Sequence, residues 1–95
     1  MLNGIHKIHL IGIAGSGMRA IANILISQGF EVSGSDIQES AVTERFRKMG
    51  ATIHIGHNAD YVKGVDAVVR STAIHADNPE LMAAHELQIP ILHRS

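Results

Sequence analysis

The feature that most constrains this chain is the glycine-rich segment Gly12-Ile13-Ala14-Gly15-Ser16-Gly17-Met18. The apolar run that ends at Gly12 predicts a buried strand before it. After it, residues 18, 21, 22, 25 and 26 are apolar, which is the spacing of an amphipathic helix. A glycine-rich turn between a strand and a helix directs free backbone N–H groups toward an anion. The segment therefore predicts a phosphate-binding turn.

The rest of the chain continues the alternation of strands and helices. Further strands are expected at residues 30–35, 51–55, 66–71 and 89–92, and further helices at residues 42–49 and 81–87. Asp77-Asn78-Pro79-Glu80 is typical of a helix start, with a polar cap, a proline in the first turn and an acid at the positive end of the dipole. This order predicts an α/β, Rossmann-like, three-layer domain. Because parallel crossovers are right-handed, a mostly parallel five-stranded sheet in the order 3-2-1-4-5 is expected.

Length, composition and charge exclude several classes of protein. The chain has 95 residues, which predicts one domain over residues 1–95. Its net charge of −1 offers no basic excess for nucleic acid or an anionic membrane, and it has no cysteine for thiol chemistry. No apolar stretch is long enough to insert in a membrane and no signal peptide is visible, so a cytoplasmic location is expected. The seven histidines are scattered, and no metal site is expected.

The glycine-rich segment by itself leaves the ligand open. Gly12 and Gly17 fit the dinucleotide fingerprint G-x-G-x-x-G, but Ala14 replaces its middle glycine. Asp36 ends the second expected strand, where an acid binds a ribose in nicotinamide enzymes. The pattern is compatible with NAD and with another nucleotide diphosphate. A structural domain that has lost its ligand is a third possibility, which the intact glycine-rich segment disfavours.

Five motifs in register resemble the N-terminal domain of the Mur ligases, over essentially the whole chain. They are Ile8 to Met18; Val32-Ser33-Gly34-Ser35-Asp36; Gly50-Ala51 leading to Gly56-His57; Ser71-Thr72-Ala73-Ile74; and Asp77-Asn78-Pro79-Glu80 leading to Ala84-His85-Glu86. Within the family, Gly15-Ser16-Gly17-Met18 favours the members that attach L-alanine over those that attach a whole peptide.

The resemblance implies an ATP-dependent, amide-forming ligase of peptidoglycan biosynthesis with three domains. The first binds UDP-N-acetylmuramate, the second binds ATP with Mg²⁺, and the third binds the incoming L-alanine. This chain has no G-x-x-x-x-G-K-S/T sequence, so we expect it to be the first domain, with no ATP site and no activity of its own. The alternative is an NAD-binding Rossmann domain of an oxidoreductase or a regulatory sensor. Ala14 and the Ser-Thr-Ala-Ile string favour the ligase.

The resemblance also implies which residues bind the UDP-sugar. Ala14, Gly15, Ser16, Gly17 and Met18 match the diphosphate loop, Ser35 and Asp36 match the segment that meets the uridine, and His57 matches a histidine on the uracil side. Ser71, Thr72 and Ala73 end the fourth strand beside this loop, and Arg94 matches a basic residue near the sugar–phosphate end.

Four further expectations concern single residues. Asn78 is expected to cap a helix first and to contact the ligand second. Gly17 is expected to let the first helix pack closely on the sheet as well as to admit the diphosphate. Arg19 and Arg70 depart from the family pattern. Arg19 either points into solvent or contacts phosphate, and Arg70 either faces the ligand or caps the sheet.

Overall fold

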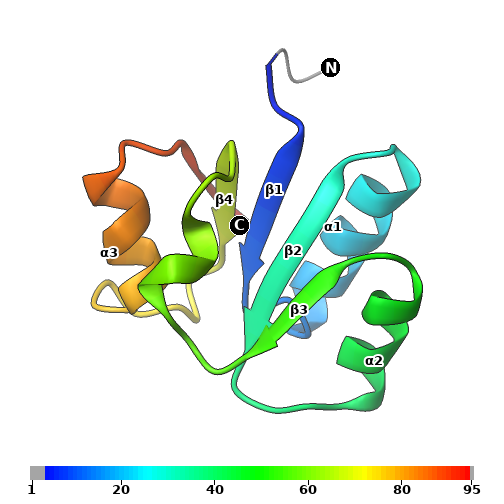
Figure 1. Ribbon diagram of the computed structural model, residues 1–95. Coiled ribbons are helices and arrows are strands. Elements are labelled where there is room, and N and C mark those ends of the chain that lie inside the picture. The colour runs from blue at the N-terminus through cyan, green and yellow to red at the C-terminus, as the bar shows by residue number, and fades with distance from the viewer. Residues whose placement is uncertain (1–3, 95) are drawn as a thin grey trace.

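A computed structural model describes residues 4–94 and has a three-layer α/β architecture (Figure 1). The strands are β1 (Lys7–Ile11), β2 (Glu31–Asp36), β3 (Thr52–Ile55), β4 (Ala67–Arg70) and β5 (Ile91–His93), and the helices are α1 (Ser16–Ser27), α2 (Ala41–Lys48) and α3 (Pro79–Glu86). The sheet order is β3-β2-β1-β4-β5, and each neighbouring pair is parallel. The predicted fold class and strand order are confirmed.

One element was not predicted from the sequence. A 3-10 helix, η1 (Ala59–Val62), follows β3 and packs beside α3. It begins at Asn58, whose side chain accepts a hydrogen bond of 2.9 Å from the backbone N–H of Asp60. Its single turn is too short to show a helical hydrophobic period, so no periodic pattern in the sequence indicates it.

Helices α1 and α2 cover one face of the sheet with an aliphatic core. This core includes Ile8 and Leu10 of β1, Met18 and Ala22 of α1, and Phe46 of α2. The glycine-rich segment lies close against the sheet at Gly34 of β2, where an added Cβ would lie 2.6 Å from Cδ1 of Ile13.

The packing role expected for Gly17 is wrong. A Cβ on Gly17 would first meet the guanidinium of Arg94 rather than the sheet. Gly34 is therefore the glycine whose small size lets the glycine-rich segment lie against β2.

Helix α3 and η1 cover the opposite face, and this second core contains polar groups. Its apolar members include Ile11, Val62, Val68 and Leu81. His9, in the middle of the central strand, is also fully buried, and β1 residues alternate so that it shares the face of Ile11. A histidine in the centre of a buried parallel strand requires hydrogen-bond partners. Those partners come from β2 and from α3, as described below.

The carboxyl ends of β1, β2 and β3 lie toward the lower edge of the sheet in Figure 1, and the parallel pairing of β4 and β5 places their carboxyl ends at the same edge of the sheet. There the chain leaves β1 through Gly12, whose φ of +75° is a conformation that glycine adopts at little cost. The backbone N–H groups of Gly12 and Ile13 both donate to the carbonyl of Ser35, at 2.8 and 3.0 Å. This fixes the start of the glycine-rich segment to the end of β2. Within residues 4–94, no helix has both the length and the apolar character to cross a membrane.

Candidate functional site

Two pockets adjoin at the carboxyl edge of the sheet. The smaller, which we call the loop pocket, has a volume of about 210 Å³ and is lined by Gly15, Ser16, Gly17, Met18, Ser71, Thr72, Ala73 and Arg94. The larger, which we call the His57 pocket, has a volume of about 400 Å³ and is lined by Gly12, Asp36, Ile37, His57, Ala73, Ile74, His75, Asp77 and Asn78. Ala73 lines both, so the two pockets adjoin, and we call them together the groove. A groove at this edge is where open α/β sheets bind ligands.

The loop pocket is built on the N-terminus of α1. Gly15 occupies the N-cap position, where it provides no side chain to accept from the first-turn N–H groups, and the first turn has no acidic residue. The other two α-helices are capped, α2 by Ser40 and α3 by Asn78. The N-terminus of α1 therefore presents backbone N–H donors and the positive end of a helix dipole to the pocket. This arrangement suits an anion.

Two arginines flank this turn. The guanidinium of Arg94 lies directly over Gly17, in the space that a side chain there would occupy. The backbone N–H of Arg94 donates to the carbonyl of Arg70 at 2.7 Å, which ties the end of β5 to β4. Arg19 is exposed, and its Nε donates to the carbonyl of Ala14 at 2.8 Å. Arg94 thus adds positive charge to the loop pocket, while Arg19 braces the turn from outside.

The turn after β4 forms the wall shared by the two pockets. Arg70 holds this turn closed, because its guanidinium donates to the carbonyl of Ile74 at 2.5 Å and to that of Ser71 at 3.2 Å. The Ser71 hydroxyl accepts from the backbone N–H of Ala73 at 3.3 Å. Arg70 is therefore a brace of the β4–α3 connection. Thr72 is exposed on the loop-pocket side of the turn.

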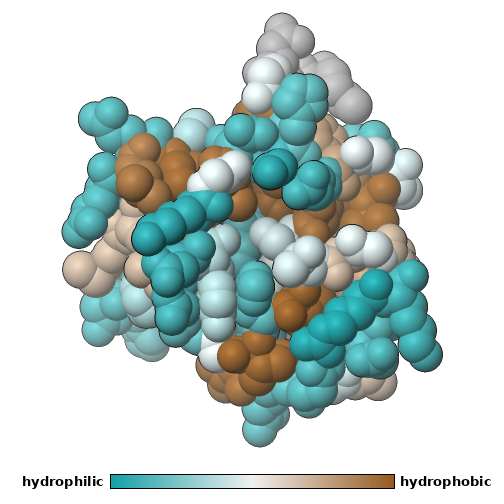
Figure 2. All heavy atoms as spheres, viewed as in Figure 1, coloured by the Kyte–Doolittle hydropathy of each residue, from teal (hydrophilic) through white to brown (hydrophobic). Residues whose placement is uncertain are grey.

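In the His57 pocket, Asp36 is oriented by the backbone around it. Its Oδ2 accepts from the N–H of Ala14 at 3.0 Å and its Oδ1 accepts from the N–H of Ile37 at 2.8 Å. A carboxylate has about four acceptor sites, so Asp36 retains capacity for a ligand hydroxyl. The next residue, Ile37, is 72% exposed. Figure 2 shows hydrophobic atoms at the lower edge of the molecule, beside the β2–α2 connection.

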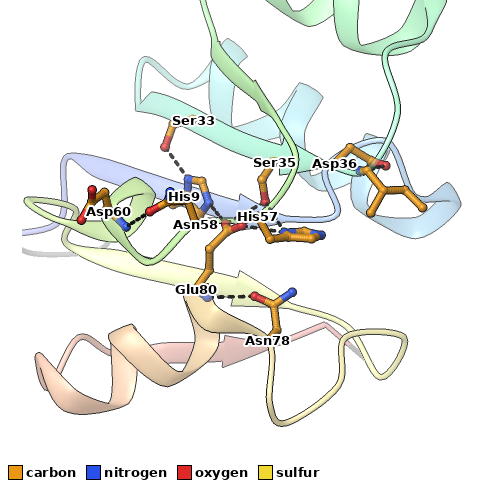
Figure 3. A network of polar contacts seen from close by, with 10 residues as sticks. His9, Ser33, Ser35, Asp36, His57, Asn58, Asp60, Asn78 and Glu80 are labelled. Carbon is orange, nitrogen blue, oxygen red and sulfur yellow. Dashed lines mark hydrogen bonds and ion pairs between the residues drawn. The ribbon is translucent and has the colours of Figure 1, made fainter.

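A buried polar network, drawn in Figure 3, adjoins the His57 pocket through the side chain of His57. Glu80, the second residue of α3, is fully buried, and its carboxylate faces three donors. It accepts from Nε2 of His9 at 2.5 Å, from the Ser35 hydroxyl at 2.7 Å and from Nδ1 of His57 at 2.6 Å. The other nitrogen of His9 lies 2.8 Å from the hydroxyl of Ser33. Among the described residues, no buried side-chain N or O atom lacks a partner.

The electrostatics of this network favour an ionised Glu80. Burial raises the pKa of the Glu80 carboxyl, but hydrogen bonds from His9, Ser35 and His57 together outweigh burial, and the net pKa lies below its usual value of 4.5. Asn78 caps the helix at this point, because its Oδ1 accepts from the N–H of Glu80 at 2.9 Å. The capping role predicted for Asn78 is confirmed.

The structure brings most of the predicted site residues into the groove. Eight line the loop pocket: Gly15, Ser16, Gly17, Met18, Ser71, Thr72, Ala73 and Arg94. Asp36, His57 and Asn78 line the other end, together with Ala73. Ala14 and Ser35 line neither pocket, because the N–H of Ala14 is bonded to Asp36 and the side chain of Ser35 is buried against Glu80. Ligand contacts by any of these residues stay a prediction.

Two members of the buried network, His9 and Glu80, were not singled out from the sequence. A signal existed for His9, since a titratable residue inside an apolar strand must find a partner. The sequence pattern around Glu80 indicates only an acid suited to a helix start. The partners are 71 residues apart in the chain, and local patterns carry no information about such a pairing.

The fold and the groove define a Rossmann-like α/β domain whose first helix has an uncapped N-terminus at the carboxyl edge of the sheet. The chain belongs to the Mur ligase family: the family model described as "Mur ligase family, catalytic domain" matches residues 7–95. It is 41% identical to UDP-N-acetylmuramate-alanine ligase from Thermotoga maritima, with a TM-score of 0.88 over 93% of this chain and 20% of that one. The chain therefore spans about a fifth of the length of that relative.

Other solved structures show how far the likeness extends. The UDP-N-acetylmuramate:L-alanyl-gamma-D-glutamyl-meso-diaminopimelate ligase from Neisseria meningitides is 26% identical, with a TM-score of 0.84 over 95% of this chain and 29% of that one. A protein solved with NADP⁺ and pinoresinol, AtPrR2, is 20% identical, with a TM-score of 0.71 over 94% of this chain and 35% of that one. Identity this low shows a shared Rossmann-like fold and nothing about the ligand.

Proposed function

We propose that residues 1–95 form the UDP-sugar-binding domain of a UDP-N-acetylmuramate–L-alanine ligase, an ATP-dependent enzyme of peptidoglycan biosynthesis in the cytoplasm. The observation that carries this proposal is the uncapped N-terminus of α1, which opens into the loop pocket under Arg94. Membership of the Mur ligase family supports the identity of the ligand. Through peptidoglycan, the parent enzyme would contribute to cell shape and cell division.

The two ends of the groove suggest how the ligand lies. The diphosphate occupies the loop pocket, where the first-turn N–H groups of α1 and the guanidinium of Arg94 are its donors. The uridine extends into the larger pocket, where the Asp36 carboxylate accepts from ribose hydroxyls and His57 lies toward the base. The turn after β4 consists of small residues, Ser71 to Ala73. They leave room for the part of the ligand that joins the diphosphate to the uridine.

The share of this domain in catalysis is positioning. By holding the UDP end, it brings the lactyl carboxylate of the sugar to a reaction centre elsewhere in the parent enzyme. ATP with Mg²⁺ supplies the activation of that carboxylate in this proposal. We place the ATP site outside this chain because its glycine-rich segment lacks the Lys of a G-x-x-x-x-G-K-S/T sequence, which reaches the β- and γ-phosphates. L-alanine likewise binds outside this chain.

Titration calorimetry of the chain with UDP-N-acetylmuramate, UDP and NAD tests the proposal. We expect the two uridine ligands to bind more tightly than NAD. Ala14 stands where the dinucleotide fingerprint has a glycine, and its methyl group keeps the pyrophosphate of a dinucleotide farther from the backbone. Tighter binding of NAD would favour an oxidoreductase or a sensor and overturn the proposal. A mixture of the chain with UDP-N-acetylmuramate, L-alanine and MgATP is expected to release no phosphate above a control without protein.

A further inference from the structure

The buried network joins four segments that surround the His57 pocket. His9 belongs to β1, Ser35 to β2, His57 to the connection after β3, and Glu80 to the first turn of α3. Glu80 is the hub, because its two carboxylate oxygens accept from all three of the other side chains. Only His57 reaches the pocket from this set, and its side chain is 19% exposed.

The direction of these hydrogen bonds fixes the hydrogen on His57. An ionised carboxylate accepts and cannot donate, so the contact of 2.6 Å to Oε2 of Glu80 requires a hydrogen on Nδ1 of His57. In Figure 3 the other ring nitrogen, Nε2, points away from Glu80. When the ring is neutral, Nε2 carries no hydrogen and is left as an acceptor on a ring that lines the His57 pocket.

A ring anchored in this way differs from an ordinary surface histidine. A free imidazole rotates and exchanges its hydrogen between the two nitrogens, so it offers a ligand either a donor or an acceptor. Burial of the carboxylate and the second bond of Glu80 to His9 hold the acceptor in place from below. The ring therefore enters the groove in one orientation and with one hydrogen-bonding character.

We propose that Glu80 is a positioning residue for ligand binding: it fixes the ring orientation of His57 and keeps the hydrogen on Nδ1, so that Nε2 accepts a hydrogen bond from a donor group of the ligand. The part of this inference that concerns ligand binding rests on the proposed function, because its experiment assumes that the chain binds UDP. It assigns a role to a buried carboxylate that touches no ligand. Its first test does not depend on binding.

That first test is the tautomer of His57 in the unliganded chain. Long-range ¹H–¹⁵N correlation spectra, assigned with the His57→Ala variant, are recorded at a pH where the ring is neutral. We expect a protonated Nδ1 and a bare Nε2 for the wild-type chain, and a mixture or the opposite tautomer for Glu80→Gln. A wild-type ring with its hydrogen on Nε2 overturns the proposal, whether or not the chain binds UDP.

The second test is a double-mutant cycle on UDP binding. Glu80→Gln removes acceptor capacity and is expected to weaken UDP binding by about tenfold. In the His57→Ala background the same change is expected to alter affinity by less than about twofold, because Glu80 acts through His57. Glu86→Gln, on the exposed end of α3, is the matched control and should leave binding unchanged.

The outcomes separate this inference from the proposed function. If wild-type binds UDP and folded Glu80→Gln binds it equally well, the positioning role is wrong and the proposed function stands. An equal loss of affinity in both backgrounds would show that Glu80 acts through general stability, which also overturns the positioning role. If wild-type does not bind UDP, the proposed function fails, and the tautomer measurement still decides the inference.

Discussion

The two ends of the groove satisfy their polar groups in opposite ways. In the loop pocket, the first-turn N–H groups of α1 have no side-chain cap, and the guanidinium of Arg94 lies over a glycine. In the His57 pocket, three polar side chains already have partners: Asp36 accepts from the backbone N–H of Ala14, His57 is bonded to Glu80, and Asn78 accepts from the backbone N–H of Glu80. The loop pocket leaves donors for an anion, whereas the His57 pocket presents groups that are already oriented. A ligand with a diphosphate and a nucleoside needs both kinds of surface.

The largest expected effect comes from giving α1 the cap that it lacks. Gly15 has φ and ψ of −61° and 151°, which any residue adopts. The carboxylate of Gly15→Asp would accept from the first-turn N–H groups and repel phosphate, so UDP affinity should fall about a hundredfold while the melting temperature is unchanged or higher.

Gly15→Ala is the control for the added Cβ, which would lie 3.2 Å from the carbonyl oxygen of Gly12. It carries no charge, so its loss of affinity should be much smaller than that of the aspartate variant. Equal losses in the two variants would mean that space, and not the free N–H groups, determines binding in the loop pocket.

A matched pair of glycine substitutions separates packing from binding. Gly34→Ala places a Cβ 2.6 Å from Cδ1 and 2.7 Å from Cβ of Ile13, and should lower the free energy of unfolding by about 2 kcal/mol. The Cβ of Gly17→Ala first meets the guanidinium of Arg94, the far end of a flexible side chain, so this variant should leave stability unchanged while weakening UDP binding. Chemical denaturation and calorimetry measure the two effects. Destabilisation by both variants would return Gly17 to the packing role that we rejected.

Acid should destabilise the chain in part through Glu80. Its pKa is lower in the folded chain than the usual 4.5, so its contribution to stability is complete above that value and is lost as the pH falls through the folded pKa. We expect the melting temperature to fall below pH 4.5, and to fall less steeply in Glu80→Gln. Two other carboxyl groups also have lowered pKa values: Glu39 through its hydrogen bond from Arg47, and Asp66 through the backbone N–H of Lys7. Both are present in the wild type and in the variant, so the difference in the pH dependence of their melting temperatures reports Glu80.

The smallest effect is expected at a capped helix. Ser40 and Thr43 form a capping box at the start of α2, and neither residue lines either pocket. Ser40→Ala should lower the free energy of unfolding by about 1 kcal/mol and leave UDP affinity unchanged. A loss of UDP affinity in this variant would show that helix stability in general, and not the uncapped turn of α1, controls the site.

The same contrast explains how much the sequence could predict. The fold class, the strand order and the loop pocket follow from local signals: alternating apolar runs, a glycine-rich turn and a helix start at Asn78. The network that adjoins the His57 pocket depends on Glu80 meeting His9 and Ser35, which lie 71 and 45 residues away. Gly34 was similarly hidden, because the need for a small residue arises from Ile13 on another segment. Neither pairing leaves a periodic or spacing signal in the chain.

The most direct test of the central claim is a ¹H–¹⁵N titration of the chain with UDP-N-acetylmuramate. We expect the largest shifts at the backbone amides of Ser16, Gly17 and Met18, because these are the uncapped donors of α1. The amides of Ala41 and Thr43, at the capped start of α2, should not move. Saturable binding that leaves the three α1 amides unshifted, or an absence of binding, would contradict the claim that this turn holds the diphosphate.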